Sequence, residues 1–280
     1  MNAESGSVST SLQAGYILHY TQWQETSFIV DAFTLEHGRI ALMAKSARAS
    51  KPRVRALYQP FRPLLLSWVG AGDLRTLTGI EESGKPMNMA DAPLACAYYI
   101  NELVLRLLGK DQPQAMVFAH YALALSELDS QQVSMEAVLR TFELQLLDAL
   151  GTLPNLSRCT ADGSDIDPDL EYRFHPANAV AVPQHNAEQT AVYGIQKDKT
   201  LMGEGDSRNV SLHPDGMTAD KGIRVSGATL LAMASLDFTS AAVLEEAKAI
   251  MKPLMRVQLG DKPLKSRELF ESFVRNKQLG

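Results

Sequence analysis

The sequence predicts an α+β protein of more than one domain, an N-terminal five-stranded β-barrel followed by a mainly α-helical domain. Apolar residues alternate with polar ones from about residue 14 to 80, which is the period of a strand. After Ser83-Gly84-Lys85-Pro86 they recur at helical spacing instead. The chain has 280 residues, 45% of them hydrophobic, which is enough to build two parts with apolar cores.

The first part of the chain carries the signals of a small barrel. Turn-forming residues at Glu36-His37-Gly38, Ser50-Lys51-Pro52 and Gly70-Ala71-Gly72-Asp73 separate apolar segments of strand length. Short strands at this spacing are typical of a small closed barrel such as an OB-fold, whose loops and open face bind oligonucleotides. The loop over residues 45–57 is long and basic. The predicted strands are residues 15–20, 27–35, 39–44, 63–69 and 74–80.

Three helices are predicted next, and we expect them to pack together. Pro93 and Pro113 suit the first turn of a helix, and Ser134 suits an N-cap. Gly109 and Gly151 stand where helices usually end. The predicted helices are residues 93–108, 113–128 and 134–150.

The pattern is lost from Pro154 to about Gly222, where Asp-Gly pairs and single aspartates punctuate short strand-like pieces at 172–174 and 179–182. We expect this stretch to be irregular and partly mobile, above all at 203–222. Helical spacing resumes at 228–236, 241–259 and 266–276. The predicted organisation is a disordered lead over 1–12, a barrel over 13–84 and a helical domain over 85–280 with an irregular insertion at about 154–225.

A basic window stands out in this acidic chain. From His37 to Gly72 there is no Asp or Glu, although the formal net charge of the whole chain is −5. Cations attract backbone phosphates and flat aromatic rings stack on bases, so the window predicts a nucleic-acid surface. A solvated basic face with its aromatic residues in the core is the alternative. We expect phosphate contacts from Arg39, Lys45, Arg48, Lys51, Arg53, Arg55 and Arg62.

Aromatic residues and a second basic cluster are further candidates for contact with nucleic acid. Trp23 and Tyr58 are weaker candidates for base stacking, whereas Phe61 follows a proline and precedes a strand, which favours the barrel core. A cluster of cations precedes the last predicted helix, where positive charge does not interact favourably with the helix dipole. This cluster has two alternative interpretations, a further contact with DNA or a solvated basic face. Its residues are Lys262, Lys265 and Arg267.

Several kinds of site are excluded or disfavoured. The chain has no phosphate-binding loop of the Gly-x-x-x-x-Gly-Lys-Ser/Thr type, no His-Glu-x-x-His helix and no Gly-x-Ser-x-Gly turn. Cys96 and Cys159 are the only cysteines, so no disulfide framework and no four-thiolate zinc site can form. A reduced cytoplasmic setting fits this cysteine usage. No apolar run approaches the length of a membrane span, and the N-terminal residues lack the pattern of a signal peptide.

An acidic loop is the remaining candidate for metal binding. Asp165, Asp167 and Asp169 alternate as in a calcium-binding loop, but Leu170 and Pro176 stand where an EF-hand needs Gly and Glu. A solvated acidic loop is therefore favoured, and no metal site is expected.

Seven short segments stand together in an order and spacing that coincidence does not explain. They are Glu25-Thr26, Gly38-Arg39, Ala44-Lys45-Ser46-Ala47-Arg48, Leu57-Tyr58-Gln59-Pro60-Phe61, Tyr99-Ile100-Asn101-Glu102-Leu103, Leu139-Arg140-Thr141-Phe142-Glu143-Leu144 and residues 259–270 with the sequence LGDKPLKSRELF. In these segments the chain resembles the RecO recombination-mediator family, over nearly its whole length.

The resemblance implies a DNA-repair protein without catalytic residues, which binds single- and double-stranded DNA and anneals complementary strands. It implies RecR and the single-stranded-DNA-binding protein as partners, and loading of the RecA recombinase at gaps, in the bacterial cytoplasm and at the nucleoid during repair. Many family members carry a four-cysteine zinc module after the third helix of the second domain. Only Cys159 remains in that region here, so we expect no zinc and no other cofactor.

The acidic and apolar C-terminal tail of the single-stranded-DNA-binding protein calls for a cation beside a hydrophobic groove. On a helix, Arg140 lies on one stripe with Leu144 and Leu147, at i+4 and i+7. The resemblance points to the same arginine as a tail-binding residue. An intrahelical pair with Glu143 is the alternative. Arg106 stands four residues after Glu102, so an ion pair on the helix explains it.

Two rival classes of function remain. The first is a protein-interaction adaptor whose barrel is scaffolding and does not bind DNA. The second is a nuclease that uses magnesium on a set of carboxylates, and it is the less favoured because their loop contains Gly and Pro and lacks a rigid arrangement of ligands. Its residues would be Asp162, Asp165, Asp167 and Asp169.

Overall fold

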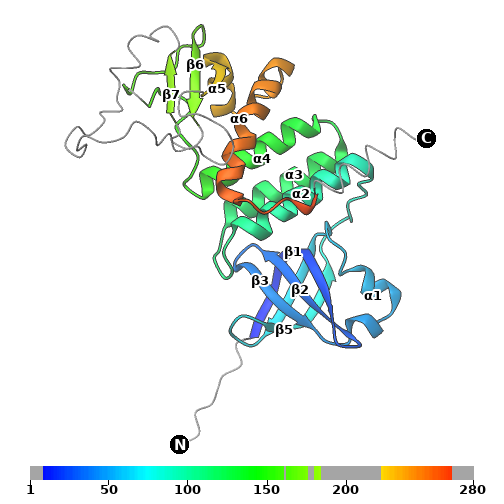
Figure 1. Ribbon diagram of the computed structural model, residues 1–280. Helices are drawn as coiled ribbons and strands as arrows, with labels where there is room; N and C mark the ends of the chain where they lie inside the picture. The colour runs from blue at the N-terminus through cyan, green and yellow to red at the C-terminus, as the bar shows by residue number, and fades with distance from the viewer. Residues whose placement is uncertain (1–8, 161, 176–179, 184–221, 267–280) are drawn as a thin grey trace, which may run out of the picture. The chain divides into compact units, whose positions relative to one another are not determined.

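The computed structural model describes residues 9–160, 162–175, 180–183 and 222–266 (Figure 1). The chain divides into two compact units. The first comprises Met1–Ala149 and Asp261–Gly280, and the second comprises Leu150–Gly260. The predicted helix at 266–276, apart from Ser266, and the stretch at 203–222, apart from Gly222, lie outside the described residues. Within the described part of the chain, no helix has the length and apolar character needed to cross a membrane.

Five strands form a closed barrel in the first unit, which confirms the predicted fold (Figure 1). Their order around the barrel is β1-β2-β3-β5-β4, and every pair is antiparallel except β3 with β5. Register shifts bend β1, so its first half pairs with β4 and its second half with β2. The strands are β1 (Ser9–Trp23), β2 (Ser27–Thr34), β3 (Gly38–Ala44), β4 (Leu64–Val69) and β5 (Arg75–Glu82).

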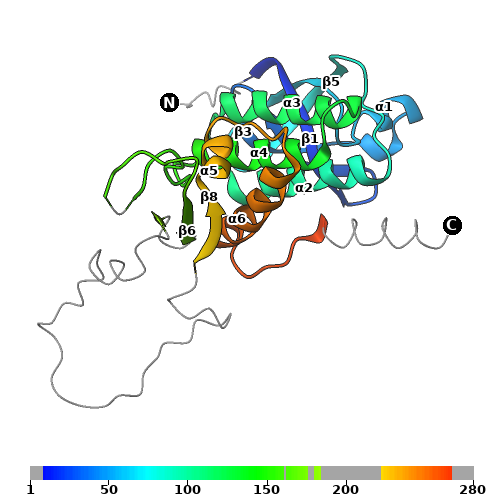
Figure 2. The same ribbon diagram turned by 90° about the horizontal axis from the view of Figure 1, so that it is seen from above.

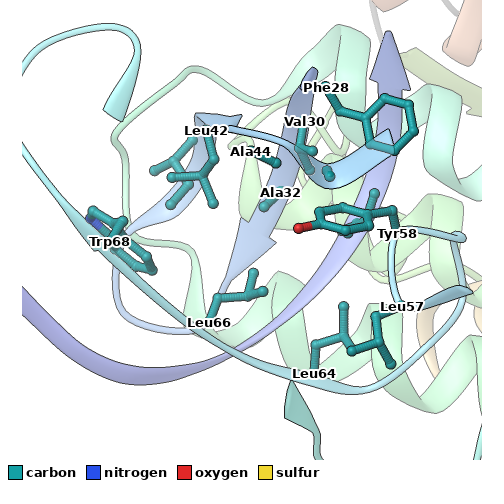
Figure 3. Packing of buried hydrophobic residues seen from close by; sticks show 13 residues of the cluster. Phe28, Val30, Ala32, Leu42, Ala44, Leu57, Tyr58, Leu64, Leu66 and Trp68 are labelled. Atoms are coloured by element: carbon teal, nitrogen blue, oxygen red, sulfur yellow. The ribbon is translucent and has the colours of Figure 1, made fainter. Parts of the chain in front are cut away.

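A cluster of buried apolar side chains fills the barrel (Figure 3). Trp68 lies at one end of the cluster, and Phe28 and Tyr58 lie at the other end with their ring centroids 5.4 Å apart. Leu57 and Tyr58 come from the connection between β3 and β4 and anchor it to the core. The connection that was predicted as a loop therefore contains two short helices, η1 (Ala47–Ala49) and α1 (Pro52–Ala56), and α1 starts with a proline as helices favour.

Three helices complete the described fold of the first unit, namely α2 (Asp91–Leu107), α3 (Ala115–Ser130) and α4 (Met135–Ala149). They join the barrel through a buried polar chain. The Asn101 side-chain amide donates to the Leu18 carbonyl at 2.9 Å, and the Tyr121 hydroxyl donates to the Asn101 side-chain oxygen at 2.6 Å. The Tyr121 ring also packs against Tyr16, with centroids 5.1 Å apart. These contacts satisfy polar groups that burial would otherwise leave unpaired.

The second unit contains a small antiparallel sheet, in the order β7-β6-β8, and two helices. The strands are β6 (Glu171–His175), β7 (Val180–Pro183) and β8 (Ile223–Ser226). β8 runs directly into α5 (Gly227–Ala234), and α6 (Ala241–Leu259) packs against α5 (Figure 2). The strand-like pieces predicted at 172–174 and 179–182 are β6 and β7, which pair with each other. β8, which was not predicted, pairs with the other edge of β6 from far along the chain.

Candidate nucleic-acid interface

The connection between β3 and β4 concentrates positive charge, and we call residues 45–57 the basic insert. Its cations lie on η1 and α1 or next to them, and all except the half-buried Arg48 are exposed. Within the described part of the chain none of them forms an ion pair, so their charges are available to an anionic ligand. They are Lys45, Arg48, Lys51, Arg53 and Arg55.

Arg48 also has a structural role in the barrel. Its guanidinium donates to the Gln24 carbonyl at 3.0 Å, and its backbone N–H donates to the Thr26 carbonyl at 2.8 Å. Both carbonyls belong to the turn between β1 and β2. Arg48 therefore fastens the basic insert to this turn, and only part of its hydrogen-bonding capacity remains for phosphate.

Two of the arginines predicted to contact phosphate are engaged elsewhere. Arg39 donates to the carbonyls of Leu105 and Leu108 at the C-terminal end of α2, the latter at 2.8 Å, and a cation is favourable at that end of a helix. Its side chain is 14% exposed, so these carbonyls occupy much of its hydrogen-bonding capacity, and its contact with phosphate stays a prediction. Arg62 pairs with Glu82 at 3.2 Å, which partly neutralises it.

The three Tyr, Phe and Trp residues of the basic window are buried, whereas Trp23, which precedes the window, is exposed. Tyr58, Phe61 and Trp68 are all less than 9% exposed, so Tyr58 cannot stack on bases as the sequence suggested, whereas Phe61 is buried as expected. Phe61 packs edge-on against Tyr98 of α2, with centroids 5.0 Å apart. Trp23, at the end of β1, is 46% exposed and stays available.

A groove of about 610 Å³ lies between the β1–β2 turn and the basic insert. Tyr20 and Phe28 line it from the strands, Glu25 from the β1–β2 turn, and Arg48 and Arg55 from the insert. The sequence did not single out Tyr20. Ile17 belongs to the barrel core, and a register shift between Ile17 and His19 alters the alternation of β1. After the shift, the exposed Tyr20 pairs with the core residue Val30.

A second basic site lies where the chain returns to the first unit. Glu102 of α2 accepts hydrogen bonds from the backbone N–H of Lys265 at 3.0 Å and from the N–H and hydroxyl of Ser266 at 2.9 and 2.8 Å. Burial raises the pKa of Glu102, but these hydrogen bonds and Arg106 outweigh burial, so the pKa lies below its ordinary value.

Arg106 completes this clamp. It pairs with Glu102 at 3.7 Å, as the spacing predicted, and donates to the carbonyl of Lys262 at 3.0 Å and to that of Pro263 at 3.3 Å. The backbone of this segment is therefore fixed on α2, while the Lys262 and Lys265 side chains are exposed. Arg267 lies outside the described residues.

Arg140 forms the intrahelical pair that the sequence offered as the alternative to tail binding. Its guanidinium lies 2.9 Å from Oε1 of Glu143, which also accepts a 2.6 Å hydrogen bond from the Tyr99 hydroxyl. Leu144 and Leu147 are each 1% exposed and belong to the core. The predicted apolar strip beside Arg140 is therefore not open on the surface, because these leucines are buried in the core.

The acidic loop forms local turns. The Asp162 carboxylate accepts hydrogen bonds from the Ser164 hydroxyl and N–H at 2.7 and 3.0 Å, and these bonds, with one from Cys159, lower the pKa of Asp162. Cys159 is buried and has no second cysteine beside it. Nowhere in the described residues do three or more His, Cys, Asp or Glu side chains gather so that they could hold a metal ion.

Comparison with known proteins supports one family over both parts of the chain. The family model described as Recombination protein O N terminal matches residues 9–83, and the one described as Recombination protein O C terminal matches residues 92–268. A DNA repair protein RecO of Actinobacillus pleuropneumoniae is 35% identical over 263 residues, 94% of this chain and 95% of the relative. The RecO proteins of Glaesserella parasuis, 34% identical over 96% of this chain and 98% of the relative, and Laribacter hongkongensis, 36% identical over 92% of each, are similar along the same length.

Proposed function

The chain belongs to the RecO family of DNA repair proteins, and from that premise we propose that it is a recombination mediator that binds single- and double-stranded DNA through the basic insert. The observation that carries the proposal is the group of exposed cations, without ion pairs in the described residues, beside a groove on the barrel. Clustered positive charge of this kind attracts phosphate whatever the sequence of the DNA.

Annealing of complementary strands follows from the same chemistry. Two strands repel each other until their phosphates are neutralised, and cations on short helices reduce this repulsion without reading the base edges. The Watson–Crick edges then stay free to pair. We propose that the protein brings two strands together in this way and has no catalytic residues of its own.

The partners are proposed from the family. We infer that RecR and the C-terminal tail of the single-stranded-DNA-binding protein bind this chain, and that the result is loading of the RecA recombinase onto DNA covered by that protein. Arg140 stays the candidate for the tail carboxylate, since its side chain is 14% exposed and a guanidinium has more donors than its pair with Glu143 uses. No cofactor is part of the proposal.

Changing Lys45, Lys51, Arg53 and Arg55 to Ala should weaken binding to a fluorescent single-stranded oligonucleotide and flatten its salt dependence. The loss of four phosphate contacts should reduce the slope of log affinity against log salt by about 3 on single strands. Arg48 is left in place because it fastens the insert to the barrel. The matched control changes four exposed lysines elsewhere, Lys85, Lys110, Lys248 and Lys252, and should keep the slope.

The same experiment decides between the proposal and its rival. An unchanged slope in the folded four-site variant would remove the basic insert as the DNA site. Absence of any retention on single-stranded DNA at moderate salt, even in the unchanged protein, would favour the adaptor whose barrel is scaffolding.

A second DNA contact is proposed at the clamp on α2. Replacing Lys262, Lys265 and Arg267 together with Ala should lower DNA affinity and reduce the salt slope by about 2. The backbone hydrogen bonds of Glu102 and Arg106 to this segment do not need the lysine side chains, so folding should persist. An unaltered affinity and slope in this variant would assign the cluster to a solvated basic face.

A further inference from the structure

We propose that the groove beside the basic insert holds one unstacked base of single-stranded DNA against the ring of Tyr20. The inference rests on the proposed DNA-binding function and makes the site more specific. It turns a charged surface that tolerates any polyanion into a site that recognises a base, and so gives the barrel a preference for single strands.

The groove has the size and the mixed lining of a ligand site. Its volume of about 610 Å³ lies within the range of about 300 to 1,000 Å³ that is common for small-molecule pockets. Apolar and aromatic surface comes from Tyr20, Phe28 and Pro52, and polar groups come from Gln22 and Gln59. A base needs this combination, because its faces are apolar and its edges form hydrogen bonds.

Tyr20 is a firmly supported stacking surface. Its ring packs against the buried Phe28 ring with centroids 4.9 Å apart, and Phe28 packs in turn against the buried Tyr58. Tyr20 itself is 38% exposed, so part of its ring is open to the groove. A ring held in place by buried neighbours loses little conformational freedom when a base stacks on it, which favours binding.

Charge in the groove orients the strand. Arg48 and Arg55 line it from the basic insert, whereas Glu25, the one carboxylate among the described residues that line it, lies in the β1–β2 turn. Phosphate is attracted to the arginines and repelled by Glu25, so the backbone should follow the insert while the base points toward Tyr20 and Glu25. In a duplex the bases are stacked on one another inside the double helix, so a duplex cannot place an unstacked base in the groove.

The test compares an oligonucleotide that carries bases with an abasic strand of the same length and phosphate count. The unchanged protein should bind the base-carrying strand more tightly than the abasic strand. Tyr20→Ala should reduce the ratio of the two affinities roughly 5- to 140-fold, the range expected for one stacked base. Tyr20→Phe should keep the ratio. The salt slope of Tyr20→Ala should stay unchanged, because no phosphate contact is lost.

Failure of the base site and failure of the proposed DNA-binding function would give different results. A base-to-abasic ratio of one in the unchanged protein, or the same ratio in Tyr20→Ala, would overturn the base site and leave the phosphate surface of the basic insert standing. Failure of the proposed function would appear instead as an unchanged salt slope in the four-site cation variant. If the alanine variant proves unstable, Tyr20→Leu serves in its place, because leucine keeps apolar packing on Phe28. Leucine offers no aromatic ring, so the preference for the base-carrying strand over the abasic strand should fall in this variant as well.

Discussion

Replacing Gly38 with alanine should lower the free energy of unfolding of the first unit by about 2 to 4 kcal/mol. Gly38 starts β3 with φ at +67°, a conformation that side chains rarely adopt. A Cβ added there would lie 1.9 Å from the Gln112 carbonyl oxygen and 2.6 Å from the carbonyl carbon. These are backbone atoms, so the connection between α2 and α3 would have to move away from the barrel.

Movement of the connection between α2 and α3 should also disturb Arg39, which follows Gly38 and donates to the last carbonyls of α2. The backbone N–H of Asp111 donates to the Arg39 carbonyl at 2.8 Å, so the contact continues from Gly38 to the next residue. Denaturant unfolding followed by circular dichroism measures the effect. The matched control is Gly72→Ala, where φ is +84° but nothing lies within 4 Å of the added Cβ, and about 1 kcal/mol is expected. Equal losses in the two variants would contradict the close approach.

The barrel could be predicted because its signals are local. Alternation and turn residues identified all five strands, with ends that differ by a few residues in four of them. β1 is longer than predicted because it pairs with two different strands, and its register shifts break the alternation that sequence reasoning relies on. In the second unit the strand-like pieces at 172–174 and 179–182 correspond to β6 and β7, but β8 was missed. β8 pairs with β6 from far along the chain, and pairing at such separation leaves no local pattern.

The cations of the site could be predicted as a group, but their individual roles could not. Arg39 and Arg55 are the same residue type in the same basic window, yet Arg39 meets the carbonyl ends of α2 while Arg55 faces the groove. The carbonyls come from a helix more than sixty residues later in the chain. Only tertiary packing brings them together, so residue type and spacing cannot separate the two arginines.

Arg140→Ala should destabilise the first unit by about 3 kcal/mol at neutral pH, because it leaves the Glu143 carboxylate buried without its cation. Glu143 is 1% exposed, and its Oε2 has no hydrogen-bond partner among the described residues. Burial raises the pKa of Glu143, while Arg140 and the hydrogen bond from Tyr99 lower it in part. Without Arg140, the pKa should rise further.

The sign of the pH dependence follows from that shift. A carboxyl group whose pKa is higher in the folded than in the unfolded protein binds protons preferentially when folded, so stability falls as pH rises between the two pKa values. Arg140→Ala widens this interval. Its loss of stability relative to the unchanged protein should therefore be small near pH 4 and should grow toward pH 8, as measured by denaturant unfolding across pH.

The double variant Arg140→Ala with Glu143→Gln separates the two roles considered for Arg140. A neutral amide does not need a cation, so most of the lost stability and the extra pH dependence should disappear. An acidic, apolar peptide that imitates the proposed tail should nevertheless fail to bind the double variant if Arg140 captures the tail carboxylate. Glu143→Gln alone keeps the arginine and should still bind the peptide. Peptide binding to the refolded double variant would show that the arginine serves Glu143 and not the partner.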